Sequence, residues 1–199
     1  MALRLNREEQ VERNRAALLA AARRVFLAKG YAGASLDAIT AESGFSKGVV
    51  YSQFTSKGDM FLGLLEERIA QRAAQNEKVS GSLSGAAAVA ALLRAGMRDS
   101  EAEPEWARLL VEFRAHAARD VALNERYAAL HSRTLKQLET TLAAIHTRAG
   151  RKPRRPLHVM AELILAFATG KALERAANPN ALPEAHVTPM LIAALGIDD

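Results

Sequence analysis

The chain has 199 residues, and its 27 Lys and Arg against 22 Asp and Glu give a formal net charge of +5. This length allows one or two small domains, and the 49% of hydrophobic residues argue against wholesale disorder. There is no cysteine, which excludes disulfides, thiolate metal sites and cysteine nucleophiles.

The N-terminal segment predicts an amphipathic helix. Apolar residues between Leu18 and Phe26 recur at helical spacing, so the helix is expected to cover about residues 8–29. Gly30 follows as a C-terminal stop, because glycine takes the left-handed conformation in which many helices end.

Three further helix starts follow in the next thirty residues. Ser35 is placed to cap a short helix that Gly44 ends, and Ser46 is placed to cap a second one. Ser56 and Asp59 have the spacing of a capping box and predict the start of a longer helix, which reaches about residue 77.

The remaining chain predicts five more helices and no strand. A Ser/Gly loop at residues 80–85 and a basic, Pro-containing linker at residues 148–156 separate some of them. The predicted helices run from this loop to about residue 97, from Pro104 past Phe113, over residues 123–147, over residues 157–177, and over residues 187–195. The expected fold is therefore all-α, with about nine helices.

Residues 35–54 carry the functional information. Two short helices that meet at a turn containing Gly44 have the layout of a helix-turn-helix, with Ile39 and Val50 placed to lock them together. The N-terminal residues of such a second helix face the base edges in the major groove. Its candidate DNA-facing residues are Lys47, Gly48, Val49, Tyr51 and Gln53.

The run from Ser35 to Lys57, together with Gly30-Tyr31, resembles the N-terminal domain of the TetR family of transcriptional regulators. The resemblance covers about residues 13–65. It implies a nine-helix homodimer with a helix-turn-helix domain at residues 8–56. It further implies that residues 57–199 form an effector-binding and dimerisation domain.

The resemblance also implies roles for single residues. Lys47, Gly48 and Val49 would face the groove, and Ser35, Ser46, Tyr51 and Lys57 would contact phosphates. Gln53 stands where many members have His; since Gln pairs with adenine or donates to phosphate, it would alter operator preference. The alternatives are a core role for Tyr51 and a merely solvated Lys47. Phe54 is expected in the core, and Arg4 and Arg7 form either a minor-groove arm or a frayed terminus.

Positive charge is concentrated in two places. Residues 1–60 hold nine basic and six acidic residues, and the linker holds Arg148, Arg151, Lys152, Arg154 and Arg155 without an acidic neighbour. The linker either contacts phosphate or a partner or is simply solvated, and we favour the solvated alternative because loops lie at the surface.

The effector region has weaker signals. A pocket between helices is the expected ligand site. Its candidate lining residues are Trp106, Leu110, Phe113, His116, Tyr127 and Phe167. Aromatic residues at helical spacing also suit a plain core. Glu112 and His116 share a helix face, but no third metal ligand is evident, so we expect neither a metal nor a cofactor.

The resemblance places the dimer interface at the last two predicted helices. Both are apolar around much of their circumference, which fits contact with a second partner surface, and the alternative is burial within one chain. The function expected is a ligand-responsive, DNA-binding regulator, most simply a repressor that a small molecule releases from a palindromic double-stranded operator. The alternatives are a helical ligand-binding protein or enzyme in which the motif is incidental, and a nucleic-acid-binding protein without an effector. Without a targeting or membrane-spanning segment, a cytoplasmic location is expected.

Overall fold

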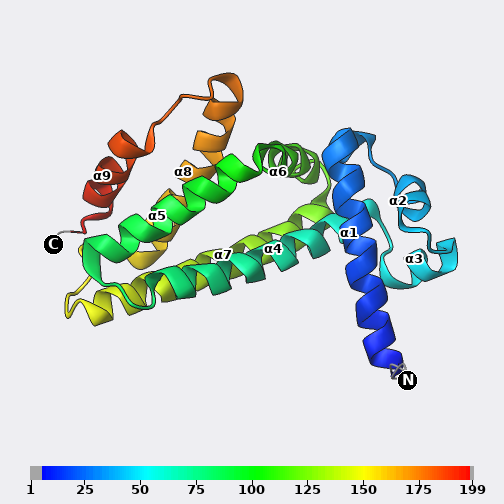
Figure 1. Ribbon diagram of the computed structural model, residues 1–199, viewed down its shortest axis with the longest axis horizontal. Helices are drawn as coiled ribbons and strands as arrows, with labels where there is room; N and C mark the ends of the chain where they lie inside the picture. The colour runs from blue at the N-terminus through cyan, green and yellow to red at the C-terminus, as the bar shows by residue number, and fades with distance from the viewer. Residues whose placement is uncertain (1–5, 198–199) are drawn as a thin grey trace. The chain divides into compact units, whose positions relative to one another are not determined.

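The computed structural model describes residues 6–197, apart from the side chains of residues 99 and 100. These described residues form nine α-helices and no strand, which confirms the all-α prediction (Figure 1). The helices are α1 (Arg7–Gly33), α2 (Leu36–Ser43), α3 (Lys47–Gln53), α4 (Lys57–Ser80), α5 (Gly85–Ala102), α6 (Pro104–Ala117), α7 (Val121–Arg148), α8 (Leu157–Ala177) and α9 (Glu184–Leu195).

Both ends of α1 follow from side chains and backbone. The Asn6 side chain accepts a hydrogen bond from the Glu9 amide, and the Glu9 carboxylate accepts one from the Asn6 amide, each at 2.8 Å. This reciprocal pair satisfies two amides that have no partner inside the helix. Gly30 interrupts α1 with a φ of 69°, as the sequence predicts, before one last turn. Arg7 begins α1, whereas Arg4 lies outside the described residues.

The predicted serine caps of α2 and α3 are confirmed. The Ser35 hydroxyl accepts from the Ala38 amide at 3.2 Å, and the Ser46 hydroxyl accepts from the Val49 amide at 3.4 Å. Gly44 lies between the helices with a φ of 70°, in the left-handed region where glycine has no steric penalty.

The start of α4 is capped by a shifted version of the predicted box. The Ser56 hydroxyl accepts from the Asp59 amide at 3.0 Å, as expected. The Asp59 carboxylate, however, accepts from the amide of Thr55 at 2.9 Å and also from the Thr55 hydroxyl. The acidic residue therefore fixes the residue before the cap and not the cap itself.

The chain divides into two compact units, up to residue 68 and from residue 69 onward. The first contains α1, α2, α3 and the first half of α4. The Phe61 ring of α4 packs edge-on against Phe26 and Tyr31, each with ring centroids 5.4 Å apart, and these two rings stack on each other. Ile39 and Val50 are fully buried, which confirms their predicted role in joining α2 to α3.

The second unit has its core among α5, α7, α8 and α9, while α6 packs on α7 and α8. The residues at its centre are apolar, and they include Val89, Leu142, Ile145, Met160, Ala161 and Leu195. Among the described residues, we find no helix with the length and apolar character needed to cross a bilayer.

Candidate DNA-binding and effector sites

Three of the eight predicted DNA-binding residues are exposed on one side of α3. Val50 anchors the helix in the core, whereas Lys47, Gly48 and Tyr51 are exposed, and 49% of the surface of Tyr51 is accessible. A Cβ atom added at Gly48 would meet only the Ser46 hydroxyl, at 3.9 Å. Packing within the protein therefore does not demand a glycine here. Phe54 is buried, as predicted.

The other predicted contacts on α2 and α3 differ in accessibility. Ser35 and Ser46 are exposed, and because each hydroxyl oxygen accepts a backbone amide, its proton stays available for a phosphate. Val49 is partly buried. The Oε1 atom of Gln53 is buried and has no hydrogen-bond partner among the described residues, so bidentate pairing with adenine, which uses this oxygen, would require the amide to turn outward.

Lys47 has an acidic partner that the sequence motif does not indicate. Its Nζ atom lies 2.6 Å from Oδ1 of Asp37, in the first turn of α2. The hydrogen bond and the charge of this carboxylate raise the pKa of Lys47, so the ammonium stays protonated. The pair links the first turns of the two helices of the motif.

Lys57 is engaged within the first unit. Its Nζ donates hydrogen bonds to the carbonyl oxygens of Tyr31 at 2.9 Å, Ala32 at 3.2 Å and Ala34 at 3.1 Å. It also lies 4.8 Å from the centre of the Tyr31 ring. An ammonium has three donors, and all three are used here. The predicted phosphate contact would require Lys57 to give up at least one of these carbonyls.

The predicted effector residues fall into different environments. Trp106 and Phe113 are buried, Leu110, Tyr127 and Phe167 are partly buried, and His116 is exposed. Three rings of α6 and α7 form a cluster, because Tyr127 packs edge-on against Phe113 and stacks on His131.

Burial shifts the pKa of two residues in this cluster, Tyr127 and His131. Burial raises the pKa of Tyr127, and the Arg114 guanidinium, 5.7 Å from the ring centre, opposes the shift. Burial also lowers the pKa of His131; Arg114 lowers it further, and Glu162 opposes them. His131 is therefore kept neutral down to lower pH than an exposed histidine.

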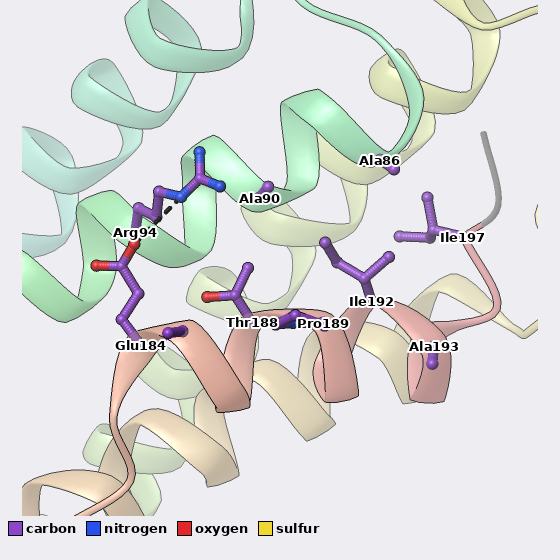
Figure 2. Close-up of a pocket in the computed structure, with 10 residues that line it drawn as sticks. Ala86, Ala90, Arg94, Glu184, Thr188, Pro189, Ile192, Ala193 and Ile197 are labelled. Carbon is purple, nitrogen blue, oxygen red and sulfur yellow. Dashed lines mark ion pairs between the residues drawn. The ribbon is translucent and has the colours of Figure 1, made fainter.

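A groove of about 400 Å³ lies between α5 and α9 and contains none of the six predicted effector residues (Figure 2). Most of its wall is Ala, Ile and Pro, and Arg94 and Glu184 pair across it at 3.2 Å. The Thr188 hydroxyl in its wall is buried without a hydrogen-bond partner among the described residues. The sequence gives no signal for this groove, since its walls are mainly small residues on two separate helices.

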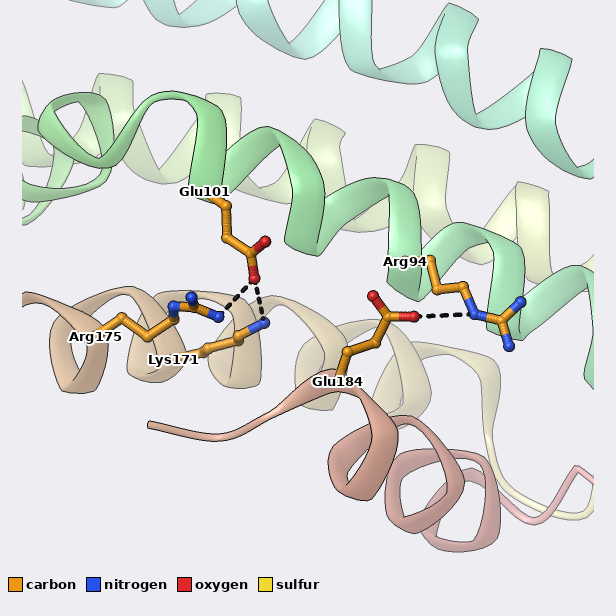
Figure 3. A network of polar contacts seen from close by, with 5 residues as sticks. All are labelled: Arg94, Glu101, Lys171, Arg175 and Glu184. Carbon is orange, nitrogen blue, oxygen red and sulfur yellow. Dashed lines mark hydrogen bonds and ion pairs between the residues drawn. The ribbon is translucent and has the colours of Figure 1, made fainter. Parts of the chain in front are cut away.

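A second ion-pair group connects α5 to α8 (Figure 3). One carboxylate oxygen of Glu101 lies 3.3 Å from Nζ of Lys171 and 2.6 Å from a guanidinium nitrogen of Arg175. The Lys171 side chain is only 3% exposed, so the carboxylate compensates a buried charge.

The basic linker is partly structural. Arg148, which the sequence assigns to the linker, is the last residue of α7 and donates hydrogen bonds to the carbonyl oxygens of Leu83 at 3.0 Å and Ser80 at 2.8 Å. These bonds satisfy the last carbonyl of α4 and one in the following loop. For this residue the solvated-linker interpretation is incomplete.

One stripe of α8 stays exposed among the described residues, and we call it the α8 stripe. Its residues recur three or four apart, so they share one helix face. They are Val159, Leu163, Ala166, Gly170 and Leu173, all exposed. A Cβ added at Gly170 would meet nothing within 4 Å. On α9, Met190 is also exposed.

Among the described residues, no group of three or more His, Asp or Glu side chains is arranged to hold a metal ion.

Two family models match the sequence. The model described as "Bacterial regulatory proteins, tetR family" covers residues 18–64, and that described as "BetI-type transcriptional repressor, C-terminal" covers residues 85–195.

Individual proteins are similar over different extents. The transcriptional activator FasR of Mycolicibacterium smegmatis is 39% identical over 66 residues, which are 33% of this chain but only 28% of FasR. A transcriptional regulator of Rhodococcus has the same fold with a TM-score of 0.73 and 26% identity, over 93% of this chain and 98% of its own.

FadR of Bacillus subtilis, solved in complex with stearoyl-CoA, also has a TM-score of 0.73, over 90% of this chain and 96% of its own. At 15% identity, this likeness concerns the fold alone.

Proposed function

The chain belongs to the TetR family of DNA-binding, ligand-responsive transcriptional regulators, and we propose that it is a homodimeric repressor that an effector releases from its operator. The observation that carries this proposal is the exposed face of α3, capped by Ser46, which presents Lys47 and Tyr51 outward from a buried Val50. No catalytic role is proposed, and the site of action would be the cytoplasm, where operator DNA lies.

On the DNA, we propose that Lys47, Gly48 and Val49 face the base edges. Tyr51 and the two cap hydroxyls of Ser35 and Ser46 would contact phosphates, which fix the register of a protein on the duplex. Gln53 would take part after its amide turns outward. Lys57 would act indirectly, by holding the end of α1 in place.

The dimer would form through the α8 stripe. Exposed apolar residues in one stripe lose water contact when a second copy covers them, and the open space at Gly170 allows close helix approach. A dimer would place two copies of α3 on successive major grooves of a palindromic site. Sedimentation at micromolar concentration should give a dimer for the wild type and a monomer for Leu163→Glu. A monomeric wild type would contradict the proposal.

The effector would bind the second unit. The match of residues 85–195 to a repressor-type C-terminal model favours repression. Because FadR was solved with stearoyl-CoA, long-chain acyl-CoA thioesters are the first compounds to test as ligands that dissociate the DNA complex. The long helix α4, which supplies residues to both units, would transmit the change.

A direct test begins with selection of binding sites from a random duplex library by the full chain. The double variant Lys47→Ala/Tyr51→Ala should bind the selected site about 30-fold or more weakly, because each lost contact costs about 1–3 kcal/mol. Lys136→Ala, which removes an exposed lysine from the second unit, should bind as the wild type does. Unchanged affinity of the double variant in a fluorescence-anisotropy titration would refute the assigned site.

A further inference from the structure

The ion pair between Asp37 and Lys47 is short but exposed, so its contribution to the stability of the fold is small. The two side chains are 67% and 68% exposed, although the charged atoms are only 2.6 Å apart. Exposed pairs of this kind add little to stability. The junction of α2 and α3 already has the buried residues Ile39 and Val50. The main consequence of the pair is therefore its effect on what Lys47 can bind.

We propose that Asp37 is a specificity-determining residue, which withholds the Lys47 ammonium from DNA phosphates and leaves it available to a neutral acceptor on a base edge. This inference rests on the proposed DNA-binding function and refines it. The Asp37 carboxylate of α2 would thus influence DNA recognition indirectly, through Lys47 of α3.

The physical reason lies in the charges of the two possible DNA acceptors. A phosphate that approaches Lys47 brings a negative charge close to the Asp37 carboxylate, and like charges at short range repel. The O6 and N7 atoms of guanine are uncharged acceptors, so they can share the ammonium with Asp37. Since Asp37 occupies one of three donors, two remain for a base.

The pair also lowers the counterion release that drives non-specific binding. A lysine already neutralised by a carboxylate displaces few cations from DNA, whereas a free lysine on a phosphate changes the slope of log K against log salt by about −0.9. The variant Asp37→Asn should therefore steepen the salt dependence on random-sequence DNA by up to about 0.9. At 0.1 M salt this corresponds to at most about an eightfold gain in non-specific affinity.

The test compares two duplexes of equal length, one selected by the wild-type chain from a random library and one of random sequence, in anisotropy titrations from 50 to 300 mM KCl. Asp37→Asn should strengthen binding to the random duplex more than to the selected one, so the ratio of the two affinities falls by about threefold or more. The matched control is Glu42→Gln on the same helix, whose carboxylate pairs with Arg24 of α1 at 2.6 Å. This variant changes the net charge equally and should leave the ratio unchanged.

A double-mutant cycle identifies the route of the effect. In a Lys47→Gln background, Asp37→Asn should no longer change the ratio. The inference is overturned if the change persists in that background, because Asp37 would then act on DNA directly. An equal response of Glu42→Gln, or no change with Asp37→Asn, also overturns it. If the wild type enriches no sequence from the library, the proposed function itself fails.

Discussion

Replacing Lys57 by Met tests whether this residue supports the fold or binds DNA. The Lys57 ammonium donates to the carbonyls of Tyr31, Ala32 and Ala34, where α1 ends and the chain turns toward α2. The substitution keeps the apolar stem of the side chain but removes the charge and all three donors. We therefore expect loosening of the α1–α2 junction in the first unit.

The magnitude follows from the contacts. A hydrogen bond with a charged partner contributes about 1.5–3 kcal/mol net, and a part-exposed cation over an aromatic ring adds about 0.5–1 kcal/mol. The three bonds share one ammonium and its desolvation cost, so they do not add independently. We expect Lys57→Met to destabilise the first unit by about 2–4 kcal/mol. This is a large part of the 5–15 kcal/mol typical of a domain.

The assay must report on the first unit. The single tryptophan, Trp106, lies in the second unit, so its fluorescence is the wrong probe. Native-state hydrogen exchange of the α1 and α2 amides measures local stability directly. The control is Lys29→Met, an exposed lysine of α1, which should change protection by less than about 0.5 kcal/mol. If Lys57→Met changes exchange no more than this control but weakens DNA binding, Lys57 is a phosphate ligand and our reasoning is wrong.

Substitutions at three further positions test other features. Thr188→Val should stabilise the second unit by about 1 kcal/mol in urea unfolding followed by tryptophan fluorescence, because it removes a buried hydroxyl that has no hydrogen-bond partner in the described part of the chain. A loss of stability would mean that the hydroxyl has a partner in solution. Burial lowers the pKa of His146 from its ordinary 6.5, so the unfolded chain binds a proton more readily than the folded chain, and stability falls as the pH drops below about 6.5. His146→Leu should therefore flatten the dependence of unfolding free energy on pH. An unchanged slope would contradict this role of His146. Gly44→Ala should lower the stability of the first unit, measured by hydrogen exchange, by about 1–2 kcal/mol, because φ is 70° and the left-handed conformation is strained for a residue with a Cβ. Gly44→Asn should cost less, because Asn tolerates this conformation better and no neighbour blocks a Cβ. Equal costs for the two variants would point to a different cause.

The sequence predicted the helices well because their ends are determined locally. Ser35, Ser46 and Gly44 act on backbone groups within three residues, so their effect can be inferred from spacing alone. The buried positions Ile39 and Val50 follow from helical periodicity in the same way.

The partners of charged side chains were not predictable. The acceptors of Lys57 are backbone carbonyls 23 to 26 residues earlier, and every residue has such a carbonyl. From the sequence alone, Asp37 can be assigned only to the first turn of α2, since its distance to Lys47 depends on how α2 and α3 pack. The α5–α9 groove was missed for a related reason, because it depends on which helices meet.

The aromatic contacts of Phe61 have a practical consequence for building hybrid regulators. A graft that joins this DNA-binding unit to a foreign effector unit at residue 56 would discard Phe61 and expose the paired rings of Phe26 and Tyr31. A junction after residue 68 would retain these contacts. The DNA-binding unit that can be transferred therefore includes the first three turns of α4, and hybrids joined at an earlier residue should aggregate or fail to accumulate.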